Sequence, residues 1–275
     1  MIIDSHQHFW KYEPTKHVWI DDDMAVIRDD FLPADLQKVY TENGVDGCVA
    51  VQADQTLAET DFLLDLSTEH DFIKGVVGWA DLRNERIDHV LERYHLEKKL
   101  KGWRHVVQGE PDHNFLLRPD FLRGISFLEK YEYTYDILIF PHQLGATLEF
   151  VKHFPHQKFV IDHIAKPYIK DGFFYGWATL MREVAKHENV HCKMSGMITE
   201  ADYNNWTTEQ LHPYMNLVLE AFGAERLMYG SDWPVCLVAG NYSAVKNIVS
   251  DFIRALSTSE QKAIMGENAV AFYNL

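Results

Sequence analysis

The sequence has little of several features that would place it in a narrow class. Among its 275 residues there are only three cysteines, and they lie far apart with no CxxC pair, so neither a zinc ribbon nor a disulfide framework is indicated. Positive charge is scarce, because 26 Lys and Arg residues stand against 41 Asp and Glu residues, a formal net charge of −15. Binding to a phosphate backbone depends on clustered Lys and Arg, so we expect no nucleic-acid partner.

Long apolar runs and nucleotide-binding motifs are also missing. No run of about 18 apolar residues occurs, and no basic segment followed by an apolar segment stands at the start. We therefore expect no membrane partner, no export, and a cytoplasmic location in which the cysteines are reduced. No GxGxxG follows the first apolar run and no GxxxxGK[ST] occurs, so a nucleotide-phosphate site is not indicated.

The sequence does contain eight short runs rich in Val and Ile, separated by amphipathic stretches. The expected strands are 1–6, 45–52, 72–79, 100–107, 133–140, 158–163, 189–195 and 226–232. The expected helices are 56–70, 86–100, 121–131, 144–154, 175–187, 206–223, 243–256 and 259–275, the last two with Ser243 and Ser259 as N-caps. Strand alternating with helix predicts an α/β fold, a single TIM (β/α)₈ barrel domain over residues 1–275, with an open doubly wound sheet as the alternative.

The first ten residues, MIIDSHQHFW, carry two histidines one residue apart. Side chains alternate along a strand, so Asp4, His6 and His8 are expected to share one face. Two imidazoles in this relation are well placed to bind one metal ion or one substrate oxygen. The alternative is that both are surface residues just beyond a strand. The stretch from Lys11 to Pro33 is longer than a usual loop, and it is expected to be either a lid or a surface excursion.

Nearly every expected strand ends in a polar or aromatic side chain, and catalytic groups of a barrel stand at these ends. The residues in question are His6, His8, Gln52, Asp54, Trp79, Asp81, Arg104, His105, Tyr135, Asp136, Asp162, His163, Ser195 and Asp232. Imidazoles and a carboxylate suit Zn²⁺, whose catalytic sites use about three protein ligands and one open position. We expect His6, His8 and Asp232 as metal ligands, with His163 as a fourth candidate. Structural alternatives stay open: a helix cap for Asp232, a hydrogen bond to a neighbouring carbonyl for His163, an ion pair with a surface acid for Arg104, and core positions for Tyr135 and Trp79.

Several motifs resemble a known family. DSHQHFW, KGWRHVVQGEPD, YTYDILIFPHQL, FVIDHIAKP, CKMSGM and LMYGSDWPVC follow one another from residue 1 to about residue 240. Together they resemble the amidohydrolase superfamily, and within it the amidohydrolase-2 sugar-lactonase group, which includes L-fuconolactonase and L-rhamnonolactonase. HxH on a first strand, DHxAKP on a later one and GSDWP on the last make a specific set.

The resemblance implies a distorted (β/α)₈ barrel that hydrolyses an aldonolactone such as L-fuconolactone or L-rhamnonolactone. In this interpretation Asp232 activates a water molecule, and His163, Arg104 and Tyr135 are the other catalytic residues. Arg104 and Tyr135 match residues that face the substrate, and we expect Trp79 to join them. The implied cofactor is one divalent metal, with Zn²⁺ as the first candidate. No bridging lysine is evident at the end of the fourth or fifth strand, which argues against two metals and leaves open whether one is required.

Two other functions stay open at this stage. Relatives in the superfamily use a similar HxH/His/Asp set for metal-dependent decarboxylation, and a barrel of this kind could bind a sugar or a metal without turnover. The sugar, the ring size and a homo-oligomeric state are not decided by the sequence. The expected ligand is a small sugar lactone.

Overall fold

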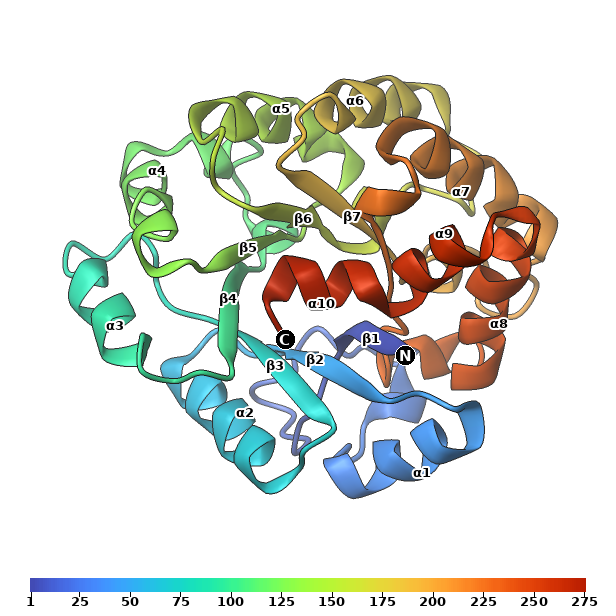
Figure 1. The fold of residues 1–275 in the computed structure, drawn as a ribbon, viewed down its shortest axis with the longest axis horizontal. Coiled ribbons are helices and arrows are strands. Elements are labelled where there is room, and N and C mark those ends of the chain that lie inside the picture. Colours follow the sequence, from blue (N-terminus) through green and yellow to red (C-terminus); the bar gives the residue numbers. More distant parts are fainter.

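Eight parallel strands form a nearly closed barrel in the computed structural model, which describes all residues 1–275. Each strand is hydrogen-bonded to the next in chain order (Figure 1). They are β1 (Ile3–Gln7), β2 (Gly47–Val51), β3 (Ile73–Gly78), β4 (Leu100–His105), β5 (Thr134–Ile137), β6 (Phe159–Ile161), β7 (Val190–Met194) and β8 (Leu227–Tyr229). All eight predicted strands are present, and the predicted barrel is confirmed.

The barrel closes between β1 and the residues that follow β8. Gln7 and Trp233 form a parallel bridge, and the backbone N–H of His8 donates to the carbonyl of Trp233 at 2.7 Å. The N–H of Asp232 donates to the carbonyl of His6 at 2.8 Å. These bonds join the end of β1 to the residues that follow β8, at the carboxyl ends of the strands.

Ten helices accompany the strands, and most of them surround the barrel as an outer ring (Figure 1). They are α1 (Pro33–Asn43), α2 (Leu57–Glu69), α3 (Ile87–Tyr94), α4 (Pro119–Ile125), α5 (Leu144–His153), α6 (Tyr175–Ala185), α7 (Thr208–Phe222), α8 (Tyr242–Phe252), α9 (Thr258–Lys262) and α10 (Asn268–Tyr273). Helix α1 was not among the predicted helices, although Pro at its first position and a left-handed Gly44 after its end are typical helix signals. The N-caps of α8 and α9 are Asn241 and Ser257, two residues earlier than predicted.

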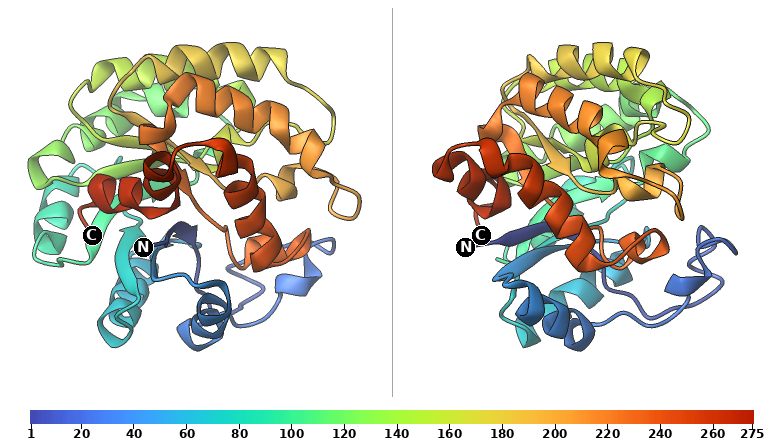
Figure 2. Two further views of the ribbon diagram at one scale, coloured as in Figure 1. Left: turned by 45° about the vertical axis from the view of Figure 1, so that its right-hand side comes forward. Right: turned by 90° about the vertical axis from the view of Figure 1, so that its right-hand side faces the viewer.

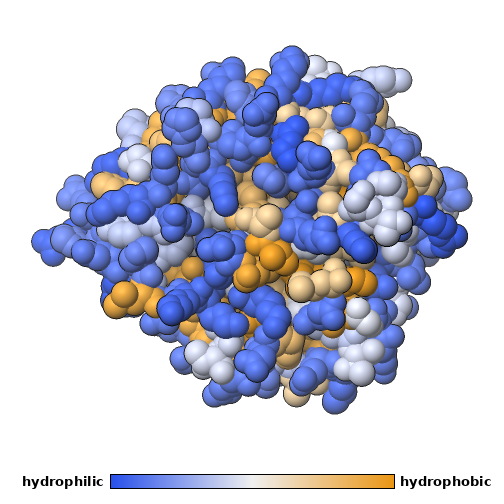
Figure 3. Space-filling model, viewed as in Figure 1, coloured by the Kyte–Doolittle hydropathy of each residue, from blue (hydrophilic) through white to orange (hydrophobic).

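The predicted final helix is divided. A π-helical turn at Ala263–Glu267 separates α9 from α10, and α10 lies across the amino-terminal end of the barrel near both chain termini (Figure 1). There Phe272 and Tyr273 pack against the apolar lower layer of the barrel interior, which consists of Ile3, Val49, Val51, Val77, Val160 and Met228. This end of the barrel is therefore filled by side chains. The outer face of this end is mostly hydrophilic (Figure 3), and none of the helices has the length and apolar character needed to cross a membrane.

Strand β1 contains an irregularity that changes which side chains face the interior. Asp4 pairs with Cys48 and Gln7 with Ala50, so three steps on β1 match two on β2, as in a β-bulge. Asp4 consequently points outward and accepts hydrogen bonds from Tyr40 of α1 and Tyr242 of α8, both at 3.0 Å. The prediction that Asp4 shares a face with His6 is wrong, because the extra residue inverts the alternation between them.

The 11–33 segment lies at the opposite end of the barrel from the chain termini (Figure 2, right). It contains little regular structure apart from a 3₁₀ turn at Ala25–Ile27. Trp19 and Met24 from this segment line the cavity described below. Of the two alternatives for this segment, a lid over the carboxyl end of the barrel matches the position better than a surface excursion.

Candidate active site

A cavity of about 390 Å³ opens at the carboxyl ends of the strands. Its volume lies within the range of about 300–1,000 Å³ that is usual for small-molecule sites. The charged and imidazole side chains that line it are His8, Arg104, His163, Lys166, Glu200 and Asp232. Apolar side chains cover much of the remaining wall, including those of Val106, Leu138 and Phe140.

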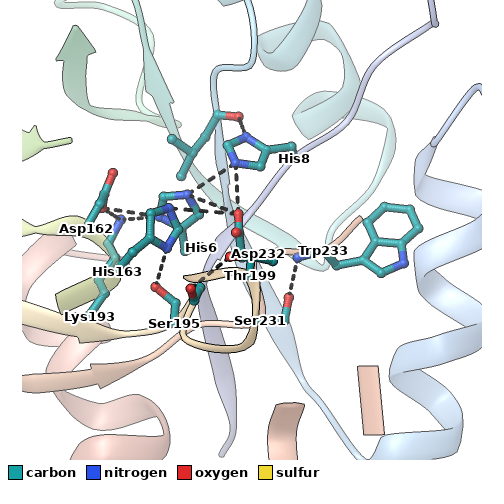
Figure 4. A network of polar contacts seen from close by, with 12 residues as sticks. His6, His8, Asp162, His163, Lys193, Ser195, Thr199, Ser231, Asp232 and Trp233 are labelled. Carbon is teal, nitrogen blue, oxygen red and sulfur yellow. Dashed lines mark hydrogen bonds and ion pairs between the residues drawn. The ribbon is translucent and has the colours of Figure 1, made fainter. Parts of the chain in front are cut away.

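His6, His8 and Asp232 converge at the base of this cavity (Figure 4). The two Nε2 atoms of His6 and His8 are 3.2 Å apart. Asp232 Oδ1 lies 3.4 Å from Nε2 of His8 and 3.9 Å from Nε2 of His6. Barrel closure explains the convergence, since backbone bonds join residues 6–8 directly to residues 232–233.

His163 completes the group. Its Nε2 lies 3.9 Å from Asp232 Oδ1, and its ring centroid lies 4.3 Å from that of His6. On the other side, its Nδ1 is 2.9 Å from the hydroxyl of Ser195 (Figure 4). His163 begins a left-handed turn that continues through residue 166, with φ values between 45° and 58°. The structure thus brings together all four predicted metal-site residues.

Arg104 lines the cavity, but most of its donors are already in use. Nη1 donates to Asp162 Oδ2 at 3.0 Å and lies 3.2 Å from Nε2 of His6. Nη2 donates to the backbone oxygen of Gln52 at 2.5 Å and to its side-chain oxygen at 2.8 Å. The guanidinium is therefore fixed in one orientation beside the imidazole pair.

Lys193 is a functional candidate that the sequence analysis missed. It is fully buried in β7, and its Nζ lies 2.5 Å from Asp136 Oδ2, 3.0 Å from Asp162 Oδ1 and 3.1 Å from Nδ1 of His6. The Tyr273 hydroxyl of α10 donates to the same Asp136 oxygen at 2.8 Å. A signal was present: a lysine inside the otherwise buried strand of CKMSGM must face a partner in the interior.

Burial sets the protonation of these groups. It lowers the pKa of His6 and of His163 well below the ordinary value, and both rings are therefore neutral near neutral pH. Burial alone would raise the pKa of Asp232, but its interactions with His163 and His8 and the Lys166 charge outweigh burial and lower the pKa. Asp232 is accordingly an ionised carboxylate beside neutral imidazoles.

Tyr135 and Trp79 do not join the site. The side chains of β5 alternate, so Asp136 faces the interior while Tyr135 faces the helices, where its ring packs against Phe150 of α5 at a centroid distance of 6.1 Å. Trp79 is half-buried behind β3 and donates from Nε1 to Nδ1 of His105 at 3.3 Å. Neither side chain lines the cavity, so the substrate-binding roles expected for them have no geometric support.

The donor set fits a single divalent ion. Ligand atoms about 2.1 Å from zinc in a tetrahedron lie about 3.4 Å from one another, close to the separations among the nitrogens of His6 and His8 and the Asp232 oxygen. His8 Nδ1 is 2.7 Å from the carbonyl of Val51, a contact that places its proton on Nδ1 and leaves Nε2 free to bind. A second candidate set, His6 with Asp162 and His163, is weaker because Asp162 is already paired with cationic side chains.

Known proteins resemble this chain over its whole length. A family model described as Amidohydrolase matches residues 3–275. An L-fucono-1,5-lactonase of Burkholderia multivorans is 36% identical over 284 residues, which cover 99% of this chain and 96% of that protein. An L-fucono-1,5-lactonase of Burkholderia ambifaria is 34% identical over 279 residues, covering 99% and 95%. The crystal structure of an amidohydrolase from Burkholderia multivorans with bound Zn superimposes with a TM-score of 0.97 at 36% identity, covering 100% of this chain and 99% of that one.

Proposed function

The chain belongs to the amidohydrolase family, and we propose that it hydrolyses the cyclic ester of a sugar acid, an aldonolactone such as L-fuconolactone. The observation that carries the proposal is the convergence of three imidazoles, those of His6, His8 and His163, on the ionised Asp232 at the floor of an open cavity. The two L-fucono-1,5-lactonases that it resembles over nearly their whole length support the substrate class.

In this proposal Asp232 is the general base. Its carboxylate accepts a proton from a water molecule as the water oxygen bonds to the lactone carbonyl carbon. The bond between that carbon and the ring oxygen then breaks, and the proton held by Asp232 passes to the ring oxygen. The product is an open-chain acid with one new hydroxyl group, so atoms and charge balance.

Arg104 and His163 are the proposed donors to the carbonyl oxygen as negative charge develops on it. Both line the cavity beside Asp232. Preorganised donors of this kind are effective because they need no reorientation during the reaction. Arg104 is fixed by its bonds to Asp162 and Gln52, and His163 is fixed by its contact with Ser195. Tyr135, whose hydroxyl is buried away from the cavity, has no part in this proposal.

His6, His8 and Asp232 are the residues that would hold one divalent ion, with zinc as the first candidate. When bound there, such an ion supplies Lewis-acid polarisation of the carbonyl. His8 presents Nε2 to the shared position through its Nδ1 contact with Val51. Asp162 Oδ1 lies 3.2 Å from Nδ1 of His6 and can accept its proton, which leaves Nε2 of that ring to face the shared position.

The charge distribution favours a neutral lactone over the carboxylate substrate of a decarboxylase. Each buried or half-buried cation of the site has an acidic partner: Arg104 pairs with Asp162, Lys193 with Asp136, and Lys166 with Glu200. A carboxylate substrate would need an unpaired cation to replace its lost hydration. No cationic side chain of the site is unpaired, so a carboxylate substrate would depend on a bound metal ion alone for its counter-charge.

The expected cytoplasmic location stays a prediction. The three cysteines Cys48, Cys192 and Cys236 are buried and unpaired, as reduced thiols would be.

A panel of aldonolactones with five- and six-membered rings tests the function, with acid release followed by a pH indicator and carbon dioxide release measured in parallel. We expect acid without carbon dioxide. Asp232→Asn should lower kcat by about 10²–10⁴-fold, the usual contribution of a general base, while the exposed Asp65→Asn serves as the matched control. Near-normal hydrolysis by a folded Asp232→Asn enzyme, or carbon dioxide as the product, would contradict the proposal.

A further inference from the structure

An ion pair on the cavity wall has no role so far beyond the effect of its lysine charge on the pKa of Asp232. Lys166 Nζ lies 3.2 Å from Glu200 Oε1, and both side chains line the cavity with 18% and 14% of their surface exposed. Lys166 ends the left-handed turn that begins at His163, and Glu200 ends the 3₁₀ turn Ile198–Glu200 after β7. The pair therefore stands beside the catalytic group but comes from different segments.

Both members of this pair have unused hydrogen-bonding capacity. A lysine ammonium has three donors and a carboxylate has about four acceptor positions, yet the two side chains have only each other as polar protein partners. The Lys166 ammonium also lies 5.6 Å from the ring centroid of Phe140, on the apolar part of the wall. The remaining donors and acceptors are available to a molecule in the cavity.

The pair is not needed to join its two segments. The N–H of Lys170 donates to the backbone oxygen of Glu200 at 3.0 Å, and an exposed ion pair links Lys170 to Asp202 at 3.9 Å. These contacts connect the same two segments outside the cavity. Linking the two segments therefore does not explain why Lys166 and Glu200 lie inside the cavity.

A neighbouring donor and acceptor of opposite charge match two adjacent hydroxyl groups of a sugar. A hydroxyl accepts from the ammonium and donates to the carboxylate, and the separation of the two charged atoms is comparable to that of neighbouring hydroxyl oxygens on a ring. A substrate anion would be repelled by Glu200 and a substrate cation by Lys166, whereas a neutral diol leaves the charge balance intact. Hydrogen bonds to charged groups are the stronger kind.

We propose that Lys166 and Glu200 form the hydroxyl-recognition subsite of the enzyme and bind two adjacent ring hydroxyls of the lactone. The proposal rests on the proposed lactonase function. In it, the two residues select polyhydroxylated lactones over bare lactone rings, while Asp232 and its neighbours act on the ester that both kinds of substrate share.

The test compares L-fucono-1,5-lactone with δ-valerolactone, which has the same ring without hydroxyl groups. Glu200→Gln and Lys166→Met are assayed beside Lys170→Met and Asp202→Asn, which break the outer ion pair between the same segments. The quantity measured is the ratio of kcat/KM for the two lactones. Using this ratio removes any effect that Lys166→Met has on Asp232 itself, since both substrates experience it. Loss of one hydrogen bond to a charged group predicts a fall in the ratio of about 10- to 100-fold for each inner variant, and no change for the outer pair.

The outcomes separate the two proposals. If wild-type enzyme hydrolyses the sugar lactone and the ratio does not fall in the inner variants, or falls equally in the outer ones, the subsite proposal is overturned while the lactonase function stands. If wild-type enzyme hydrolyses no lactone, the proposed function fails and the subsite fails with it. Should δ-valerolactone turn over too slowly, monodeoxy lactones replace it, and Glu200→Gln must then have its smallest effect on a lactone that lacks one of the bound hydroxyls.

Discussion

Replacing Lys193 by methionine should destabilise the barrel because it unbalances a buried layer of charge. Lys193 and Arg104 face the carboxylates of Asp136 and Asp162 inside the barrel, and all four side chains are buried. Two positive and two negative charges sum to zero. Methionine keeps a long apolar side chain of similar shape, but it leaves one carboxylate without a cation.

The size of the effect follows from burial. Removing one partner of a buried ion pair costs about 3–5 kcal/mol, a large part of the about 5–15 kcal/mol by which proteins are usually stable. An unfolding entropy of about 2.1 cal/mol/K per residue over 275 residues gives about 0.6 kcal/mol/K, so a loss of about 4 kcal/mol lowers Tm by about 7 °C. Because burial raises the pKa of Asp136 to about 6, this carboxylate can take up a proton in acid. The loss should therefore be smaller at about pH 5 than at about pH 8.

Urea titration and thermal unfolding measure this loss. The double variant Lys193→Met/Asp136→Asn removes one charge of each sign and should recover at least half of the lost free energy of unfolding. Lys98→Met, at an exposed position, is the control for lysine removal as such. If the single variant loses less than about 1 kcal/mol, or the double variant is no more stable than the single one, charge balance is not what holds this layer together.

Three further predictions concern other parts of the molecule. Tyr135→Phe should leave kcat/KM unchanged in the lactone assay, because Tyr135 faces α5 and not the cavity. A loss of 10-fold or more would show that Tyr135 does contribute to the reaction. Burial raises the pKa of Glu59 from the ordinary 4.5 to about 7, so the folded state holds this proton more tightly than the unfolded chain, and stability should fall by at most about 3 kcal/mol from about pH 5 to about pH 8. Glu59→Gln should remove that part of the slope in urea titrations, and an unchanged slope would assign it to other groups. Elemental analysis should find at most one zinc per chain, because both candidate donor sets share His6. This zinc should be lost in His8→Ala, which removes one ligand of the preferred set, and two zinc ions per chain would contradict this geometry.

The fold was predictable because each barrel strand is a short apolar run between amphipathic stretches. Each of the eight runs forms a strand in the structure. Helix α1 was not predicted because it follows the long 11–33 segment and has a weak apolar face. Pro33 and Gly44 at its two ends indicate the helix more strongly than its apolar periodicity does. The break between α9 and α10 could not be read from residues 259–275, since a π turn leaves helical periodicity nearly intact.

The site was only partly predictable because strand alternation has to be counted from a known starting point. His6, His8, His163 and Asp232 belong to recognisable motifs and do converge. Which neighbour of each faces the interior depends on irregularities such as that between Asp4 and Gln7, and similar shifts occur between β2, β3 and β4. On β5 the residue expected to face the substrate was Tyr135, whereas its neighbour Asp136 is the one that faces the interior. The same uncertainty about which face a side chain takes explains why Lys193 on β7 was not predicted.

The turn at residues 163–166 shows why some site geometry has no sequence signal at all. None of its four residues is glycine, yet all have φ between 45° and 58°, a conformation that costs about 1–2 kcal/mol per residue in L-amino acids. The surroundings hold it: Trp177 donates from Nε1 to the carbonyl of Ile164 at 2.8 Å, and the first and last side chains of the turn contact Ser195 and Glu200. Through this turn two residues three positions apart both face the cavity, one beside Asp232 and one on the wall. The strain is thus retained where the proposed catalytic and substrate-binding side chains meet, as expected when surrounding contacts over-determine a functional conformation.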